Sequence, residues 1–258
     1  MLTFMRVQFA ALLIMTTSLL SPTHGASADT RCYEMRVYYA APGKLEALNS
    51  RFRDHTVKLF EKHGMQNIGY WMPLENKDQK LVYVLAYPNR QAREASWKAF
   101  MADPDWTKAY KASEVDGKLV AKVEVSFMTA TDYSPAIAPS LAAPRVFELR
   151  TYTATAGKLD NLNARFRDHT LELFAHHGMK NLAYWNLSAG EKGADQKLIY
   201  ILSHASKAAG EASFKTFRED PKWKAARVAS EEKAGGSLTA PEGVKSDYMQ
   251  ATDYSPTK

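Results

Sequence analysis

The sequence predicts an α+β fold in which two ferredoxin-like units, each with the order βαββαβ, pair sheet to sheet within one chain as an α/β barrel. Two observations support this prediction. The same short segments recur in the same order in the two halves of the chain. Within each half, the apolar residues switch between the two-residue period of strands and the longer period of helices. Repetition on this scale indicates one structural unit that occurs twice.

The longest repeated segments are RFRDHT, at residues 51–56 and 165–170, and ATDYSP, at residues 130–135 and 251–256. The shorter segments GKL, HGM, YW and DQKL recur between them in the same order. A second copy of the unit therefore follows the first along nearly its whole length, and the repeat decides the architecture.

The repeat also predicts the domain boundaries. We expect a first repeat over residues 29–133, a Pro- and Ala-rich linker over residues 134–144, and a second repeat over residues 145–258. The spacing between matched segments grows along the second copy. We therefore expect loop insertions near residues 188–194 and 235–243, which are polar and contain glycine.

Each element of the first copy has a local signal. Residues 33–39 alternate as a strand does, and residues 44–63 have helical periodicity. At about 100° per residue, one face of that helix carries Leu45, Leu48, Phe52, Thr56, Leu59 and His63 within about 40°. The later elements are strands over 68–72, 81–87 and 120–130 and helices over 92–101 and 106–114. Two helices on one face of a sheet leave its other face apolar, and the second copy is the natural cover.

The first 28 residues predict export. A short basic start is followed by the uncharged apolar residues 7–20 and by small residues that end at Ala28, where we expect cleavage of a signal peptide. The apolar run is shorter than the about 20 residues that a membrane-spanning helix needs. We expect a periplasmic or secreted protein that has no membrane contact after cleavage. Cys32, the single cysteine, cannot form an internal disulfide, and its role is left open.

Several segments together resemble a known family. They are EMRVY at residues 34–38 and ELRTY at 148–152, the helix His, the His-Gly that follows it, the Tyr-Trp strand and the Asp-Pro-x-Trp of the second helix. In their order and spacing, these segments resemble the NIPSNAP domain of the dimeric α/β-barrel superfamily. The resemblance covers nearly all of residues 32–256, as two successive domains. The resemblance implies the paired-sheet fold. The superfamily includes cofactor-free monooxygenases, haem-degrading enzymes, peroxidases and proteins without a known activity, and NIPSNAP members mostly lack an assigned reaction.

His55 and His169 are the candidate catalytic residues. On a regular helix they lie at the edge of the face turned toward the sheet, and in superfamily enzymes the pocket lies between helices and sheet. There a histidine would act as a general base or a hydrogen-bond anchor. The alternative is a half-buried structural histidine. For His63 and His177, which end the helix before a glycine, a structural role at the helix C-terminus is favoured.

Polar residues recur on one face of the first strand of each copy. Glu34, Arg36 and Tyr38 correspond to Glu148, Arg150 and Tyr152. We expect them to form Glu–Arg pairs between the two repeats, which would fix the register of an otherwise apolar interface. A polar ligand site inside the barrel is the functional alternative.

Aromatic residues are numerous in both copies, and they predict either core packing or a pocket for a planar ligand. The candidate ligand-binding residues are Tyr70, Trp71, Tyr83, Trp97, Tyr184, Trp185 and Tyr200, with Trp106, Phe214 and Trp223 in the same set. The Asn of the first strand and the His of the second helix that are typical of haem-degrading enzymes have no counterparts here.

No metal site or cofactor is predicted, because the sequence has no His-Glu-x-x-His, cysteine cluster or Gly-rich phosphate loop. Nucleic acid is not an expected partner, since acids and bases are interspersed at a net charge of +6. The leading hypothesis is an exported barrel that binds a small apolar or aromatic molecule between helix and sheet. The alternatives are a cofactor-free oxygenase or isomerase that uses the helix His, and a structural or interaction protein. Assembly into a homo-oligomer is left open.

Overall fold

The computed structural model describes residues 29–139 and 145–258. The predicted signal peptide and the end of the predicted linker lie outside these residues. Within the described part of the chain, no helix combines the length and the apolar character that a membrane crossing requires.

Both repeats contain the predicted elements in the predicted order. The first repeat consists of β1 (Cys32–Ala40), α1 (Leu45–Arg51), η1 (Phe52–Thr56), α2 (Val57–Lys62), β2 (Gln66–Pro73), β3 (Lys80–Tyr87), α3 (Arg90–Ala102), α4 (Pro104–Ser113) and β4 (Val120–Ala130). The second consists of β5 (Val146–Ala154), α5 (Leu159–Arg165), η2 (Phe166–Thr170), α6 (Leu171–His176), β6 (Lys180–Leu187), β7 (Lys197–His204), α7 (Lys207–Glu219), α8 (Pro221–Lys233) and β8 (Thr239–Ala251).

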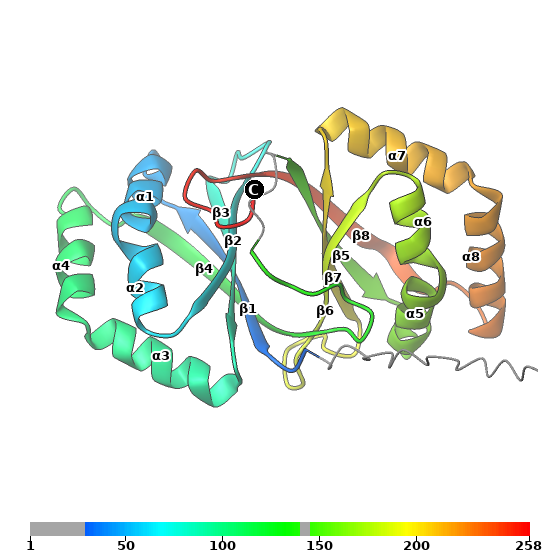
Figure 1. The fold of residues 1–258 in the computed structure, drawn as a ribbon, viewed down its shortest axis with the longest axis horizontal. Coiled ribbons are helices and arrows are strands. Elements are labelled where there is room, and N and C mark those ends of the chain that lie inside the picture. The colour runs from blue at the N-terminus through cyan, green and yellow to red at the C-terminus, as the bar shows by residue number, and fades with distance from the viewer. Residues whose placement is uncertain (1–28, 140–144) are drawn as a thin grey trace, which may run out of the picture.

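The two sheets close into one antiparallel barrel with the strand order β1-β3-β2-β8-β5-β7-β6-β4 (Figure 1). Each repeat contributes four neighbouring strands. The seams between repeats are the pairs β2–β8 and β4–β6, where Trp71 lies opposite Ala251 and Ala130 opposite Trp185. Closure removes the free sheet edges, which would otherwise expose unpaired backbone groups. The predicted pairing of the repeats is confirmed.

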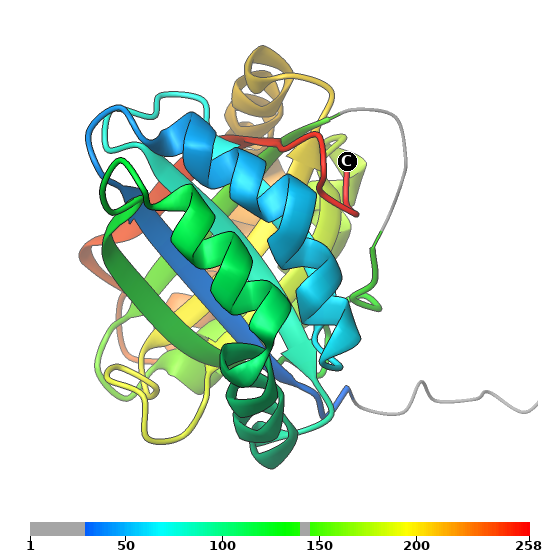
Figure 2. The same cartoon turned by 90° about the vertical axis from the view of Figure 1, so that its left-hand side faces the viewer.

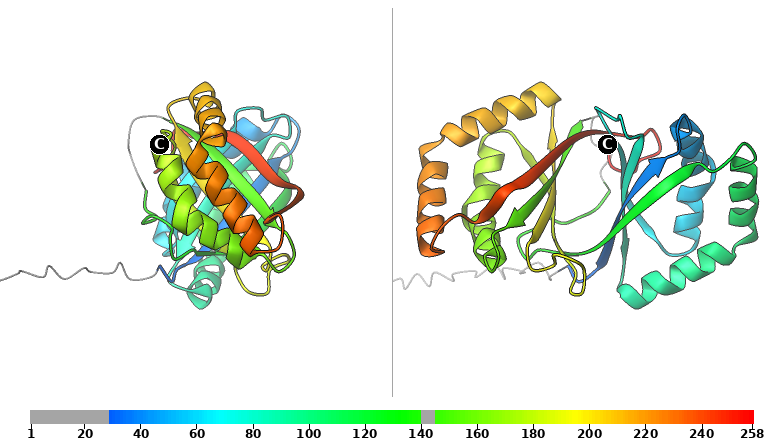
Figure 3. Two further views of the ribbon diagram at one scale, coloured as in Figure 1. Left: turned by 90° about the vertical axis from the view of Figure 1, so that its right-hand side faces the viewer. Right: turned by 180° about the vertical axis from the view of Figure 1, so that it is seen from behind.

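The helices of each repeat cover the outer face of its own four strands. Figure 2 shows α1, α2 and α4 lying across the first sheet, and Figure 3 shows the same arrangement in the second repeat. The apolar residues therefore form three clusters: one inside the barrel and one under each helical layer. Tyr33, Met35, Trp71, Phe147 and Trp185 fill the barrel interior.

The repeated RFRDHT segment forms a π-helical turn inside an otherwise continuous helix. In the first repeat the amide of Val57 donates to the carbonyl of Phe52, and Leu171 and Phe166 are paired in the same way in the second. The hydroxyl of Thr56 donates to the carbonyl of Arg51 at 3.1 Å, which supplies a partner for a carbonyl that the wide turn frees. π-Turns of this kind occur often at functional sites.

The loop predicted over residues 235–243 is confirmed only in its first part. Residues 235–238 form a turn, whereas residues 239–243 belong to a strand. β8 begins at Thr239, and its pairing with β5 shifts between Tyr152 and Ala154. A Cβ on Gly243 would lie 2.7 Å from the carbonyl oxygen of Thr153, so only glycine fits here. The rest of the inserted residues are thus absorbed as a bulge within a long strand. The first insertion is a loop, between β6 and β7.

Each of the two ATDYSP segments packs against the other repeat, not against the repeat that it follows in the chain. After β4, Tyr133 Oη donates to Asn163 Oδ1 at 2.7 Å, in the helix of the second repeat. After β8, Tyr254 Oη donates to Asn49 Oδ1 at 2.6 Å, in the helix of the first repeat. Figure 1 shows the red C-terminal tail running back onto the first repeat. Each repeat is therefore completed by the tail of the other.

The described part of the predicted linker contributes to the core. Ile137 is buried in the cluster inside the barrel, and its carbonyl accepts a hydrogen bond from Arg31 Nη2 at 2.8 Å. The segment after β4 thus closes one end of the barrel as well as connecting the repeats.

Candidate functional site

Each repeat contains a cavity between its helices and its sheet, at equivalent positions. The first cavity has a volume of about 390 Å³ and the second about 320 Å³, which lies at the lower end of the range of small-molecule pockets. Both are lined by the first strand, the π-helical turn and the two following helices of the repeat. Aromatic side chains are the most frequent lining residues of both cavities.

The lining of the two cavities follows the repeat, with a few changes. The first is lined chiefly by Arg36, Tyr38, Arg51, Phe52, Thr56, Phe60, Trp97, Phe100, Met101, Trp106, Tyr110 and Glu114. The second is lined by Arg150, Tyr152, Arg165, Phe166, Thr170, Phe174, Phe214, Phe217, Arg218, Trp223, Arg227 and Glu231. Arg218 and Arg227 stand where the first repeat has Met101 and Tyr110.

A buried glutamate lies behind the first cavity. Glu34 is fully buried and accepts hydrogen bonds from Arg36 at 2.6 Å and from Arg93 at 2.8 and 2.9 Å. Tyr87 Oη and Trp97 Nε1 also donate to it, at 3.1 and 3.0 Å. Burial alone would raise the pKa of Glu34, but the two guanidinium groups outweigh it and hold the pKa below its ordinary value. The cluster fixes Arg36 over the Trp97 ring, at 4.4 Å from its centroid.

The second repeat holds the equivalent glutamate with different partners. Glu148 contacts Arg150 Nη1 at 2.5 Å, His204 Nε2 at 2.9 Å and Ser246 Oγ at 2.5 Å. Burial would raise the pKa of Glu148, but His204 and Arg150 outweigh it and the pKa is again lowered. Arg150 lies over the Phe214 ring, 4.3 Å from its centroid.

The expectation that these glutamates and arginines pair between the repeats is wrong. Within the described residues, every hydrogen-bond partner of Glu34 and Glu148 belongs to the same repeat as the glutamate. Alternation along the strand allows either face, and the apolar neighbours Tyr33 and Met35 occupy the barrel interior. Glu34, Arg36, Tyr38, Glu148, Arg150 and Tyr152 therefore face the helical layer instead.

Arg51 and Arg165 are functional candidates that the sequence reasoning missed. Both line the cavities and both are 5% exposed. They belong to the RFRDHT segment, in which the histidine is the only residue that the sequence predicts to be functional. A signal was present, because Arg51 lies one helical turn after Leu48, on the side of the helix that is turned to the core.

The orientation expected for His55 and His169 is wrong. Both side chains are exposed, and neither lines the helix–sheet cavities. The wide π-turn breaks the uniform helical wheel, so that Phe52 and Thr56 are buried while His55 between them faces solvent. His55 instead borders an outer groove of about 400 Å³ with Asp54, Lys58, Asp105 and Lys108.

The aromatic candidates separate into three groups. Tyr70, Tyr83, Tyr184 and Tyr200 are fully buried beneath the helices and stack in pairs, with ring centroids 5.3 and 5.0 Å apart. Trp71 and Trp185 face the barrel interior and border a separate cavity of about 310 Å³ near residues 135–139. Trp97 lines the first helix–sheet cavity, as do Trp106 and, in the second, Phe214 and Trp223.

His63 and His177 join the two helical motifs of each repeat. His63 Nε2 lies 2.6 Å from Asp103 Oδ2, and His177 Nε2 lies 2.8 Å from Asp220 Oδ2. The same aspartates cap the next helix through their other oxygen. The structural role holds, but the partner is the Asp of Asp-Pro-x-Trp rather than the helix carbonyls.

Among the residues that the structure describes, one group could hold a metal ion: His176, His177 and Asp220, with donor atoms within 4.8 Å of one another. In the first repeat Lys62 stands in place of His176, and its ammonium lies 2.8 Å from Asp103. In the first repeat, the Lys62 ammonium thus supplies a positive charge beside the equivalent aspartate. Because Thr216 and Asp220 already bind His177, the group is explained as a joint between helices.

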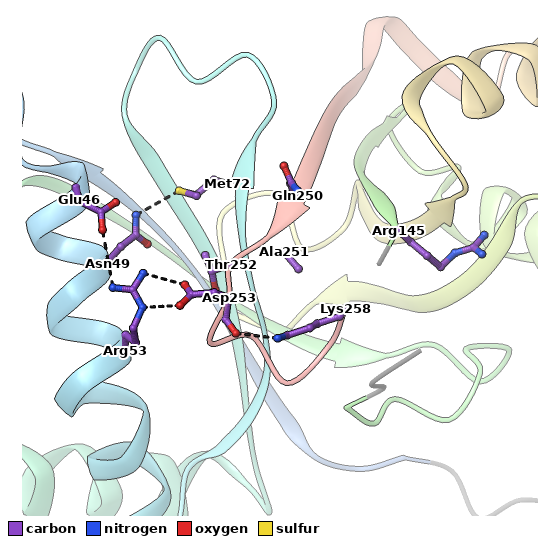
Figure 4. Close-up of a pocket in the computed structure, with 10 residues that line it drawn as sticks. All are labelled: Glu46, Asn49, Arg53, Met72, Arg145, Gln250, Ala251, Thr252, Asp253 and Lys258. Carbon is purple, nitrogen blue, oxygen red and sulfur yellow. Dashed lines mark hydrogen bonds and ion pairs between the residues drawn. The ribbon is translucent and has the colours of Figure 1, made fainter. Parts of the chain in front are cut away.

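A further cavity, of about 430 Å³, lies where the C-terminal tail meets the first repeat (Figure 4). Arg53 pairs there with Asp253 at 2.5 and 2.9 Å and approaches Glu46 at 3.8 Å. Lys258 Nζ donates to the Asp253 carbonyl at 2.8 Å. These charges are engaged with one another, so this cavity is a joint between the repeats, and the helix–sheet cavities are the better ligand candidates.

Comparison with known proteins agrees with the fold. A NIPSNAP protein of unknown function from Agrobacterium tumefaciens is 22% identical over 42% of this chain and 94% of its own, with a TM-score of 0.38. A proposed monooxygenase from Lactobacillus acidophilus is 11% identical over 86% of this chain and 94% of its own, with a TM-score of 0.52. A similar protein from Fusobacterium nucleatum, also described as a proposed monooxygenase, is 10% identical over 86% and 92%, with a TM-score of 0.53. Among curated proteins, none matches this chain.

The two long matches show a shared barrel fold alone, because their identity is low. The family model is more specific. The NIPSNAP model matches residues 33–135 and again residues 147–256, which together span most of the chain. The chain therefore belongs to the NIPSNAP family, with two tandem copies of its domain.

Proposed function

We propose that the protein binds a small organic molecule with an apolar or aromatic body in the helix–sheet cavity of each repeat. The observation that carries this proposal is the pair of equivalent cavities, each walled by aromatic rings and each holding ordered arginines. Apolar walls with a few fixed polar groups are the usual character of small-molecule sites.

Native mass spectrometry of residues 29–258 tests the proposal. We expect a co-purifying or added small aromatic compound to bind with up to two molecules per chain. Val123→Trp and Val244→Trp place a large ring at the mouths of the first and second cavities, at positions that are each 40% exposed and so tolerant of change. Each variant should remove one bound molecule.

Val228→Trp is the matched control, because Val228 is 54% exposed and lies outside the lining of both cavities. Its stoichiometry should equal that of the unchanged protein. An apo mass after incubation with a panel of small aromatic compounds, or unchanged binding in both cavity variants, would contradict the proposal.

The oxygenase or isomerase alternative receives no support from His55 and His169, since both lie outside the cavities. The names of the two structural neighbours do not change this, because a shared barrel fold at such low identity does not carry a reaction with it. A purely structural role is disfavoured by the cavities themselves.

We also propose export to the periplasm or beyond the cell, from the charge and hydropathy order of residues 1–28. Expression in a bacterial host followed by fractionation tests this. The expected product begins at Asp29 in the extracytoplasmic fraction, and an intact N-terminus in the cytoplasmic fraction would contradict it.

A further inference from the structure

The buried arginines of the π-turns have donors that the protein does not satisfy. Arg51 and Arg165 are each 5% exposed, yet the Nε of both has no hydrogen-bond partner within the described residues, and neither does Nη1 of Arg165. A buried donor without a partner is costly, and for a charged group the cost is larger. These donors belong to residues that line the cavities.

The second cavity has the larger surplus of positive charge. Arg150, Arg165, Arg218 and Arg227 line it, against the single carboxylate of Glu231. Arg150 is already paired with Glu148. Glu231 is shared, since its Oε1 lies 3.5 Å from both Arg165 Nη1 and Arg227 Nε, longer than a good hydrogen bond. Burial lowers the pKa of Arg165, as expected for a cation that is incompletely compensated.

The first cavity is better balanced. Arg51 Nη1 donates to Ser113 Oγ at 3.1 Å and to Glu114 Oε1 at 3.2 Å, and its guanidinium lies over the Trp106 and Tyr110 rings. Tyr110 and Met101 occupy the positions of Arg227 and Arg218. The cavity of the second repeat is therefore the one whose arginines have too few negatively charged partners.

We propose that the cavity of the second repeat takes an organic carboxylate, with its carboxylate against Arg165 and Arg227 and its apolar body against Phe166 and Trp223. The inference rests on the proposed function and names the ligand class for one of its two sites. A guanidinium presents parallel donors that match a carboxylate, and Nε and Nη1 of Arg165 form no hydrogen bond within the described residues. The aromatic walls suit an aryl or short alkyl body.

Isothermal titration of the mature protein, residues 29–258, with matched pairs of ligands tests the class. The acids are benzoate, phenylacetate and 2-naphthoate, and the neutral partners are their primary amides. We expect the best acid to bind about tenfold or more tightly than its amide. In ¹H–¹⁵N spectra of arginine side chains, the Arg165 Nε–H resonance should shift on addition of that acid.

Three variants locate the effect. Arg218→Met with Arg227→Tyr installs the residues of the first repeat at two exposed positions, and should weaken binding of the acid about two- to fivefold with the fold intact. Arg165→Gln should abolish the preference for acid over amide. Arg167→Gln is the control, because Arg167 is exposed and paired with Asp132 outside the cavity. It should leave both affinities unchanged.

The outcomes separate the inference from the function on which it rests. If acids and amides bind equally and the Arg218 and Arg227 variant changes neither, the ligand class is wrong while the cavity remains a binding site. If neither acids nor amides bind, the proposed function fails with it. If the acid preference is lost equally in Arg167→Gln, the effect is one of general surface charge and the inference is overturned.

Discussion

The two repeats hold the same buried glutamate in different ways. In the first, Arg93 reaches from α3 to Glu34. In the second, Gly210 occupies that helix position, and the space it leaves is filled by Tyr248 and His204. His204 stands where the first repeat has Tyr87, and each contacts the glutamate of its own repeat. These differences fit one another, and they show that two different sets of partners can compensate the same buried carboxylate.

The apolar layer beneath the helices has changed far less. Phe52 and Phe166 pack against stacked tyrosine pairs with nearly the same ring geometry in both repeats. Packing of large rings tolerates little variation in shape. A polar cluster can be rebuilt when several partners differ together. The two repeats therefore differ in the polar residues around the glutamate and not in the aromatic layer.

The largest expected effect follows from removing the glutamates. Glu34→Ala removes the carboxylate that the half-buried Arg36 and Arg93 share, and leaves Arg93 with the exposed Glu94 alone. It should lower the free energy of unfolding by about 3 kcal/mol. Glu148→Ala leaves one arginine and a histidine and should cost about 2 kcal/mol. Urea unfolding measures both, with exposed Glu172→Ala as the control. Equal costs would show that the two clusters are energetically alike.

Gly210→Ala should also destabilise the protein, although alanine is the better helix former. Its Cβ would lie 2.9 Å from Tyr248 Oη and 3.0 Å from His204 Cγ. We expect a loss of about 1 to 3 kcal/mol from overpacking, measured by urea unfolding. Tyr248→Phe in the same chain should reduce the penalty, because it removes the closest atom. A stabilised Gly210→Ala would show that the space is not filled.

The exchanged tails are a region where the repeats are alike, so their variants should match. Tyr133→Phe and Tyr254→Phe each remove one hydrogen bond to an asparagine of the other repeat. Each should cost about 1 kcal/mol in thermal or urea unfolding. Tyr39→Phe, whose exposed hydroxyl contacts Glu124 at 3.1 Å, is the control and should cost little. Clearly unequal stability losses in Tyr133→Phe and Tyr254→Phe would show that the two tails do not contribute equally.

The smallest effect should appear in acid. The pKa values of Glu34 and Glu148 lie below their ordinary 4.5. A lowered folded-state pKa contributes stability that is present above pH 4.5 and is lost as the pH falls through the lower value. In Glu34→Gln and Glu148→Gln, stability should therefore fall less steeply below pH 4.5 than in the unchanged protein. Equally steep curves from urea unfolding at each pH would contradict this.

The fold was predictable because its signals are local and repeated. Strand alternation and the helical period placed the elements, and the uncovered apolar face of one unit implied its partner. The family resemblance agreed with this and is confirmed by the family model. The closed barrel follows from the order of the elements and from the apolar face that each unit leaves uncovered.

The sites were less predictable for three physical reasons. A π-turn looks like ordinary helix in sequence, so His55 was placed on the wrong side. Strand alternation does not say which face is which, so Glu34 and Arg36 were assigned to the interface between repeats. Arg93 and His204 do not recur between the copies, so the repeat pattern does not indicate the partners that distinguish the two clusters.

The exchanged tails make this chain the covalent equivalent of a domain-swapped dimer. Two separate copies of one repeat would each have to fit an identical partner, so every change would appear on both sides at once. Joining them removes that constraint, because each half needs to fit only the other. One half is then free to gain Arg218 and Arg227 beside its cavity while the other keeps Met101 and Tyr110. The tether thus turns a symmetric assembly into one that can specialise.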